Sequence, residues 1–138
     1  MNWSTNYGDP VGAGGGTEIR ATGLTDVDET GTSYEVGKGR YKIVIVVSAI
    51  EIASNDENYN IDIEANTRAA TSTYKTIGGL SLGPTEMTGR SSDDTIGTYV
   101  ILIDNPNDHQ IRTHVRLVGS VATGINFVAT VYPLDGKR

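Results

Sequence analysis

The two histidines of the chain, His109 and His114, are the first candidates for chemistry, because imidazole acts as a base and as a metal ligand near neutral pH. They are five residues apart, and an odd spacing in a strand places side chains on opposite faces. The pair is therefore not expected to bind one metal ion without a bulge between the two residues. We expect His109 to be solvated beside the turn at 105–108, and His114 to share a strand face with Arg112 and Arg116.

The acidic segment Asp26–Gly31 resembles the start of a calcium-binding loop, with carboxylates at alternate positions and glycine at the sixth. The twelfth position of such a loop carries a glutamate that closes the metal cage, and here it is Gly37. The flanking segments also lack a helical pattern. We therefore expect an acidic turn in solvent. The alternative is a non-helical calcium site that combines Asp26, Asp28 and a distant carboxylate.

The sequence contains no recognisable motif for catalysis. The carboxylate pairs Asp56-Glu57 and Asp93-Asp94 are adjacent, whereas glycoside hydrolysis needs two carboxyl groups that face each other across the substrate. The chain has no cysteine, and neither histidine belongs to a local nucleophile motif. The run Gly12–Gly16 lacks the Gly-Lys-Ser/Thr ending of a phosphate loop. We predict no catalytic residue, no metal ligand and no cofactor, and interpret the chain as an interaction protein rather than an enzyme.

The segment Arg40–Ala53 carries the strongest signal for a function, because it is apolar on both faces of a predicted strand. One face holds Tyr41, Ile43, Ile45, Val47 and Ala49, and the other holds Val44, Val46, Ile50 and Ile52. The next run, Tyr59–Asn66, alternates apolar and polar residues and predicts a strand with one solvated face. Apolar residues on the outer side of a strand need a cover, since they would otherwise promote aggregation. The second row of Arg40–Ala53, or the opposite row, is therefore predicted to lie at a contact with another subunit.

The whole chain has the composition of an all-β protein, with 37% hydrophobic residues and 17 glycines among its 138 residues. This length suits one domain with a sizeable core. Candidate strands are predicted at Thr17–Leu24, Gly31–Val36, Arg40–Ala53, Tyr59–Asn66, Tyr74–Leu82, Gly97–Asp104, Gln110–Gly119 and Ile125–Leu134. We predict one antiparallel β-sandwich domain of about eight strands over residues 17–138. The strand number favours a jelly roll over an immunoglobulin-like sandwich.

Residues 1–16 are expected to form a flexible N-terminal arm outside this domain, because five of them are glycines. The arm carries Trp3 and Tyr7, two aromatic side chains of the kind that is enriched in protein interfaces. Our hypothesis is that they dock on a partner and become ordered there. The alternative is that this end of the chain frays.

The net charge of −6 and the pI of about 4.7 argue against nucleic acid and anionic membranes as partners, because both repel an acidic protein. Arg112, His114 and Arg116 form a basic row, which is too small for a nucleic-acid site. We expect this row to contact an acidic neighbour and include it among the interface candidates. No signal-peptide pattern is present, and no run approaches the roughly 18 apolar residues of a membrane helix, so no membrane partner is predicted.

Four runs, Tyr41–Asn66, Thr76–Gly83, Gly97–Asn105 and His114–Leu134, are similar to the small jelly-roll cement, or decoration, proteins on the capsids of tailed bacteriophages. The shared features are a two-faced strand, an acidic turn before Tyr59, a glycine-rich turn, and a late pair of strands. The resemblance implies an external virion protein that bridges neighbouring major-capsid subunits and stiffens the shell without doing chemistry. It carries over no individual functional residue.

The hypothesis from sequence is therefore a capsid cement protein on the virion exterior, made in the host cytoplasm. Its expected partners are the major capsid protein and further copies of itself, as a dimer or trimer. The alternative is a carbohydrate- or receptor-binding β-sandwich of the tail-fibre or adhesin type, although the tyrosines that would form its sugar platform are scattered. These tyrosines are Tyr34, Tyr59, Tyr74, Tyr99 and Tyr132. A small jelly-roll enzyme ranks last.

Overall fold

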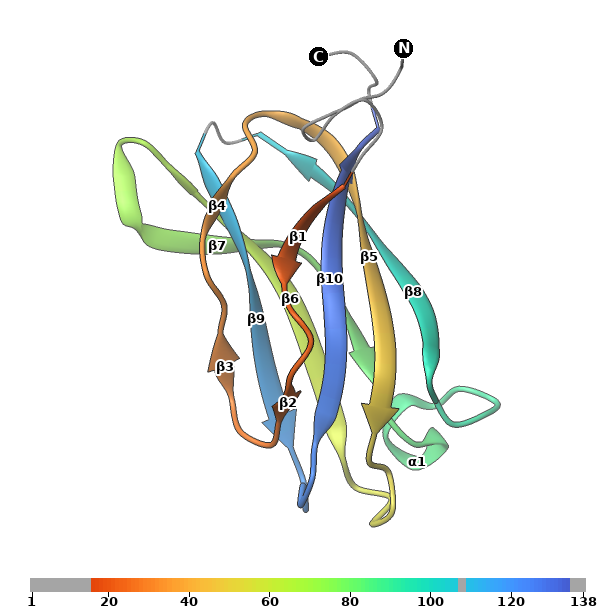
Figure 1. The fold of residues 1–138 in the computed structure, drawn as a ribbon. Helices are drawn as coiled ribbons and strands as arrows, with labels where there is room; N and C mark the ends of the chain where they lie inside the picture. The colour runs from red at the N-terminus through yellow and green to blue at the C-terminus, as the bar shows by residue number, and fades with distance from the viewer. Residues whose placement is uncertain (1–15, 107–108, 135–138) are drawn as a thin grey trace.

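The protein is a sandwich of two antiparallel sheets, as the sequence predicts (Figure 1). The structure is a computed structural model, and it describes residues 16–106 and 109–134. Sheet I contains, in spatial order, β1 (Thr17–Arg20), β10 (Ile125–Pro133), β5 (Gly39–Ile50) and β8 (Gly97–Asn105), with β2 (Leu24–Thr25) also beside β10. Sheet II contains β3 (Glu29–Thr30), β9 (Gln110–Val118), β6 (Asn58–Thr67) and β7 (Ala70–Leu82), with β4 (Tyr34–Glu35) also beside β9.

The strand pairing between early and late parts of the chain is nested. β1 and β2 pair with β10, β3 and β4 pair with β9, β5 pairs with β8, and β6 pairs with β7. The first and last described strands are therefore neighbours. A short helix, α1 (Thr85–Thr88), lies in the connection from β7 to β8 (Figure 1). Within the described ranges, no helix has the length and apolar character needed to cross a membrane.

Six of the eight predicted strands match observed strands within a few residues, and the two N-terminal ones do not. The expected strand Thr17–Leu24 is divided into β1 and β2 by residues 21–23. The ladder with β10 also shifts register within β1, between Glu18 and Arg20. After the break, the side chain of Asn126 accepts the N–H of Gly23 at 2.8 Å, so a side chain replaces the backbone partner. The expected strand Gly31–Val36 is reduced to β4, and β3 forms just before it.

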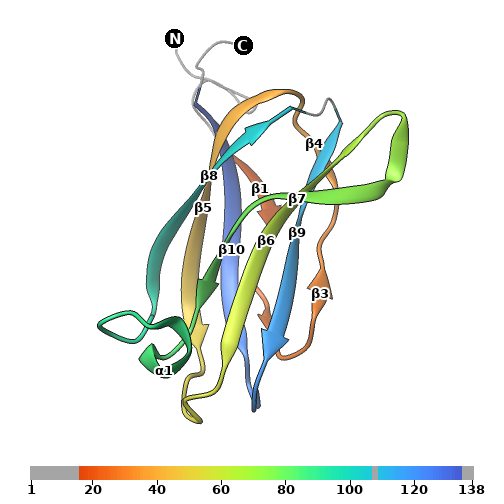
Figure 2. The same cartoon turned by 180° about the vertical axis from the view of Figure 1, so that it is seen from behind.

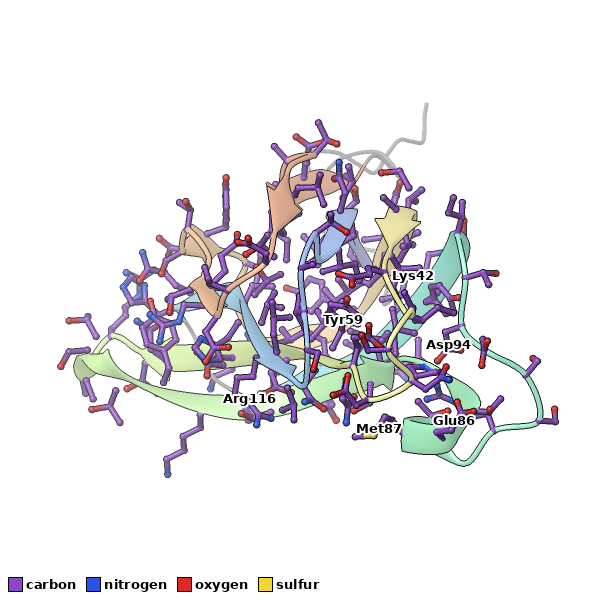
Figure 3. The ribbon with its side chains drawn as sticks, turned by 90° about the horizontal axis from the view of Figure 1, so that it is seen from below. Lys42, Tyr59, Glu86, Met87, Asp94 and Arg116 are labelled. Carbon is purple, nitrogen blue, oxygen red and sulfur yellow. The ribbon has the colours of Figure 1, made fainter. Side chains whose placement is uncertain are left out.

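The core lies between the sheets and is filled from the faces that strand alternation predicts. The inward residues of β5 are Tyr41, Ile43, Ile45 and Val47, and those of β6 are Tyr59, Ile61, Ile63 and Ala65; all are buried. Figure 3 shows Tyr59 in the space between the two layers. Each large apolar side chain buried in this way stabilises the fold by about 1.5–3 kcal/mol. Because of this alternation, a chain with 37% hydrophobic residues can fill the core between two packed sheets.

A bulge in β5 overturns the strand prediction near its end. Phe127 pairs with Val47, but Asn126 pairs with Ala49, so Ser48 is an extra residue in the ladder. An extra residue reverses the alternation, and Ile50 therefore pairs with buried Ile125 and packs against the core. The prediction that Ile50 belongs to the outward row is wrong for this reason.

The side chain of Arg20 enters the interior and is only 7% exposed. Its guanidinium pairs with the carboxylate of Glu29 at 2.8 Å and 3.1 Å, and also donates to the carbonyl oxygens of Gly23 and Phe127. The guanidinium also lies 4.1 Å from the centre of the Phe127 ring. Arg20 thus joins β1 and β10 of sheet I to β3 of sheet II, and its charge is paired as buried charges must be.

Candidate interaction surface

The outward side of sheet I carries a group of aliphatic side chains from three neighbouring strands. We call it the sheet I face and define it by Val44 and Val46 of β5, Val100 and Leu102 of β8, and Val128 of β10. Leu102 is 69% exposed, Val100 53% and Val46 44%, and the other two are half-buried. Figure 1 shows β10, β5 and β8, which carry this face, side by side.

The strand register makes these side chains neighbours. Val44 lies opposite Val100 in the β5–β8 ladder, and Val46 lies opposite Val128 in the β5–β10 ladder. Directly opposed residues of an antiparallel pair have Cβ atoms about 4.5–5.5 Å apart, which is close enough for their side chains to interact. The result is a continuous apolar surface rather than isolated exposed residues. Such a surface is typical of sites for protein–protein contact.

Polar groups border the sheet I face at the end where β10 stops. Lys42 lies opposite Leu102 on β8 and Tyr132 on β10, and its Nζ is 5.4 Å from the centre of the Tyr132 ring. Thr130, next along β10, lies opposite Val44. An apolar centre with a polar border is the usual arrangement of a binding interface. The described residues of this surface supply hydrophobic contact and no cluster of acids or bases.

The sequence located only part of this surface. Val44 and Val46 are on it as predicted, whereas Ile50 turns inward and Ile52 lies beyond the end of β5, where it is half-buried. Val100, Leu102 and Val128 were not predicted. The signal was available in β8, where Tyr99, Ile101 and Ile103 alternate with Val100 and Leu102, so that this strand is also apolar on both faces. Trp3 and Tyr7 lie outside the described residues.

The basic row of β9 lies on the outward side of sheet II and meets acidic side chains of β6, as predicted. Arg112 donates from Nε to Glu64 at 2.8 Å, and Arg116 donates to Asp62 at 3.1 Å. The guanidinium of Arg112 also stacks 3.6 Å from the centre of the Tyr74 ring. Figure 2 shows β6, β7 and β9 of this sheet together. The two arginines are thus already neutralised within the sheet, which makes them weaker candidates for a charged partner.

The two histidines and the acidic turn contact neighbouring residues of the same chain. His114 Nδ1 is 3.2 Å from the hydroxyl of Thr30. The prediction that His109 is solvated is wrong, because its side chain is only 15% exposed. Its Nδ1 lies 4.0 Å from Oε1 of Glu35. Asp28 accepts the N–H of Leu117 at 2.9 Å, so this carboxylate ties the acidic turn to β9. In the part of the chain that the structure describes, no group of three or more histidine, cysteine, aspartate or glutamate side chains is arranged to hold a metal ion.

Two carboxylates fasten the loop between β9 and β10 at the far end of the sandwich. Glu51 accepts the N–H groups of Thr123 at 2.7 Å and Ala122 at 2.8 Å, and Asp56 accepts the N–H and hydroxyl of Ser120 at 3.0 and 2.9 Å. The hydrogen bond from Thr123, followed by that from Ala122, lowers the pKa of Glu51 below its ordinary value of 4.5. The hydrogen bonds from Ser120 likewise lower the pKa of Asp56. Both carboxylates therefore stabilise the folded state in their charged form.

The Glu51 contact predicts a pH-dependent loss of stability. Because its folded pKa is lower than its unfolded pKa, its contribution is complete above pH 4.5 and disappears as the pH falls through the folded pKa. We expect Glu51→Gln to lower the urea midpoint at pH 7, and the difference from the wild type to shrink below pH 4.5. Urea denaturation at a series of pH values measures this. Glu18→Gln, at an exposed position of β1, is the control, and an equal effect of both substitutions would contradict the prediction.

No protein-family model matches the chain, and no curated protein sequence matches it.

Proposed function

We propose that this protein is a capsid cement, or decoration, protein of a tailed bacteriophage. In this proposal it binds the outside of the shell, bridges neighbouring subunits of the major capsid protein and stabilises them, without catalysing a reaction. It acts on the virion exterior after synthesis in the host cytoplasm, and it self-associates as a dimer or trimer. The observation that carries the proposal is the sheet I face, an apolar surface on the outside of a sandwich whose core is already complete.

The size and chemistry of the surface support a binding role. A specific interface of ordinary size covers about 800 Å² on each partner, so the five aliphatic residues would form its apolar centre and the polar border would supply the rest. Many copies on one shell add avidity, so each contact need only be modest. The similarity of Tyr41–Leu134 to the cement proteins supports the choice of the shell as the partner in this proposal.

The strand order supports the jelly-roll part of this proposal. If β1 with β2, and β3 with β4, each count as one interrupted strand, the sandwich has eight strands. Their nested pairing then joins the first with the eighth, the second with the seventh, the third with the sixth and the fourth with the fifth. An immunoglobulin-like sandwich places its first strand beside its second strand instead. We therefore infer a jelly roll.

The alternative, a carbohydrate-binding module, is less well supported by the positions of the tyrosines. Tyr59 is fully buried, where burial and the charges of Glu51 and Glu57 raise its pKa to about 12. Tyr74 is on sheet II and is covered by Arg112, whereas Tyr132 is on sheet I. These rings do not form one aromatic platform for a sugar.

The proposal predicts that one charge on the sheet I face weakens shell binding. Leu102→Asp places a carboxylate at the most exposed aliphatic position of the face, and its burial against a partner costs free energy because the charge loses water. We expect roughly a tenfold or greater loss of affinity for shells that lack the protein. Co-sedimentation with such shells, from the phage that encodes the protein, measures this loss.

Val118→Asp is the matched control, because Val118 is 50% exposed and lies on β9 of the other sheet. We expect this variant to bind as the wild type does. The shell should also resist heating better with the wild-type protein bound. Wild-type protein that stays monomeric in light scattering and does not co-sediment with the shells would contradict the proposal.

A further inference from the structure

The chain enters the fold at the margin of the sheet I face. Gly16 is the first described residue, and a Cβ atom at this position would lie 2.4 Å from Cγ2 of Thr130 and 2.7 Å from two ring carbons of Tyr132. Both side chains alternate with the buried Ala129 and Val131, so they are on the outward side of β10. The preceding residues, 1–15, are therefore attached beside the aliphatic face.

We propose that residues 1–15 cover the sheet I face of their own chain in the free protein. In this arrangement the aromatic side chains of Trp3 and Tyr7 rest on the aliphatic side chains of β5 and β8. The inference does not depend on the identity of the partner: any protein that binds the face, including a capsid subunit, would first displace this segment.

The segment is long enough for this contact. Neighbouring strands are about 4.8 Å apart, so the path from β1 across β10 and β5 to β8 is about 14 Å. The fifteen residues before Gly16 can extend over roughly 50 Å. Because the segment is tethered to β1, its effective concentration at its own face is in the millimolar range when the tether spans the distance. This favours the segment's own chain over a second copy.

The chemistry of the segment matches that of the face. Its larger apolar residues are Met1, Trp3, Tyr7, Pro10 and Val11. The five residues from Gly12 to Gly16 are four glycines and one alanine. At Gly16 a side chain would clash with the Tyr132 ring. Its one acidic residue, Asp9, suits the border near Lys42, because the opposite charges attract. The face offers aliphatic side chains alone at its centre, which is a suitable surface for aromatic rings.

The fluorescence of Trp3 tests this proposal directly, because Trp3 is the only tryptophan of the chain. For the full-length free protein we expect a blue-shifted emission and an acrylamide quenching constant several-fold lower than for a peptide of residues 1–15. The substitutions Val100→Thr and Leu102→Thr, made together, keep the strand-forming character of β8 but remove its apolar surface. In this variant we expect the emission and the quenching constant to approach those of the peptide.

Val118→Thr on sheet II is the control and should leave Trp3 unchanged, and far-UV circular dichroism checks that each variant is folded. If the double variant fails to fold, Leu102→Thr alone replaces it, with a smaller expected shift in the same direction. A wild-type Trp3 that is as accessible as the peptide would overturn the proposal. Protection that disappears on hundredfold dilution would overturn it too, because it would show that a second copy supplies the segment. All measurements use the free protein, so their outcome is independent of shell binding.

Discussion

Arg20→Ala is expected to lower the free energy of unfolding by about 3 kcal/mol or more. The substitution leaves the Glu29 carboxylate, which is 30% exposed, without its guanidinium partner. It also removes the donors to the carbonyl oxygens of Gly23 and Phe127 and the contact with the Phe127 ring. Urea denaturation followed by circular dichroism measures the loss.

Arg116→Ala is the control for this prediction, because Arg116 also pairs with one carboxylate but is 52% exposed. Exposed ion pairs stabilise proteins by about 0–1 kcal/mol, so the control should lose no more than this. Arg20→Lys should lose most of what alanine loses, because an ammonium group cannot make the forked contact with Glu29. Equal effects at Arg20 and Arg116 would show that the buried contacts of Arg20 do not stabilise the fold.

Gly124→Ala is expected to destabilise the protein by about 2–5 kcal/mol, for two reasons that add. Gly124 has a φ of +89°, a conformation that disfavours a side chain. An added Cβ would also lie 1.9 Å from the carbonyl oxygen of Thr25, which no real structure tolerates, so β2 would have to move away from β10. The movement would also disturb the hydrogen bond from the N–H of Glu51 to the carbonyl of Gly124.

Gly37→Ala separates these two reasons. Gly37 has a φ of +75°, but an added Cβ there meets no atom within 4 Å. This variant therefore reports the backbone strain alone and should lose only about 1–2 kcal/mol. Thermal unfolding of both variants gives the comparison, and a loss at Gly37 that equals the loss at Gly124 would contradict the contact with Thr25.

Some residues of the candidate interaction surface are predictable from the local sequence pattern, and others depend on the pairing of distant strands. Val44 and Val46 were predictable because an apolar residue at every second position of a strand is visible in the sequence. Their neighbours on the face, Val100 and Val128, lie more than fifty residues away from them in the chain. Only the β5–β8 and β5–β10 ladders bring these side chains together.

The sequence by itself determined the β-class, most of the strands, and the two buried rows of β5 and β6, because alternation follows from the geometry of a single extended chain. It also determined that the basic row of β9 would meet acids. The tertiary structure alone decided which strands are neighbours, that Ile50 turns inward at a bulge, and that Arg20 is buried between the sheets. The physical reason is that register and burial depend on contacts between segments that are distant in the chain. Many such pairings are possible, and the residues next to one another in the sequence do not indicate which of them forms.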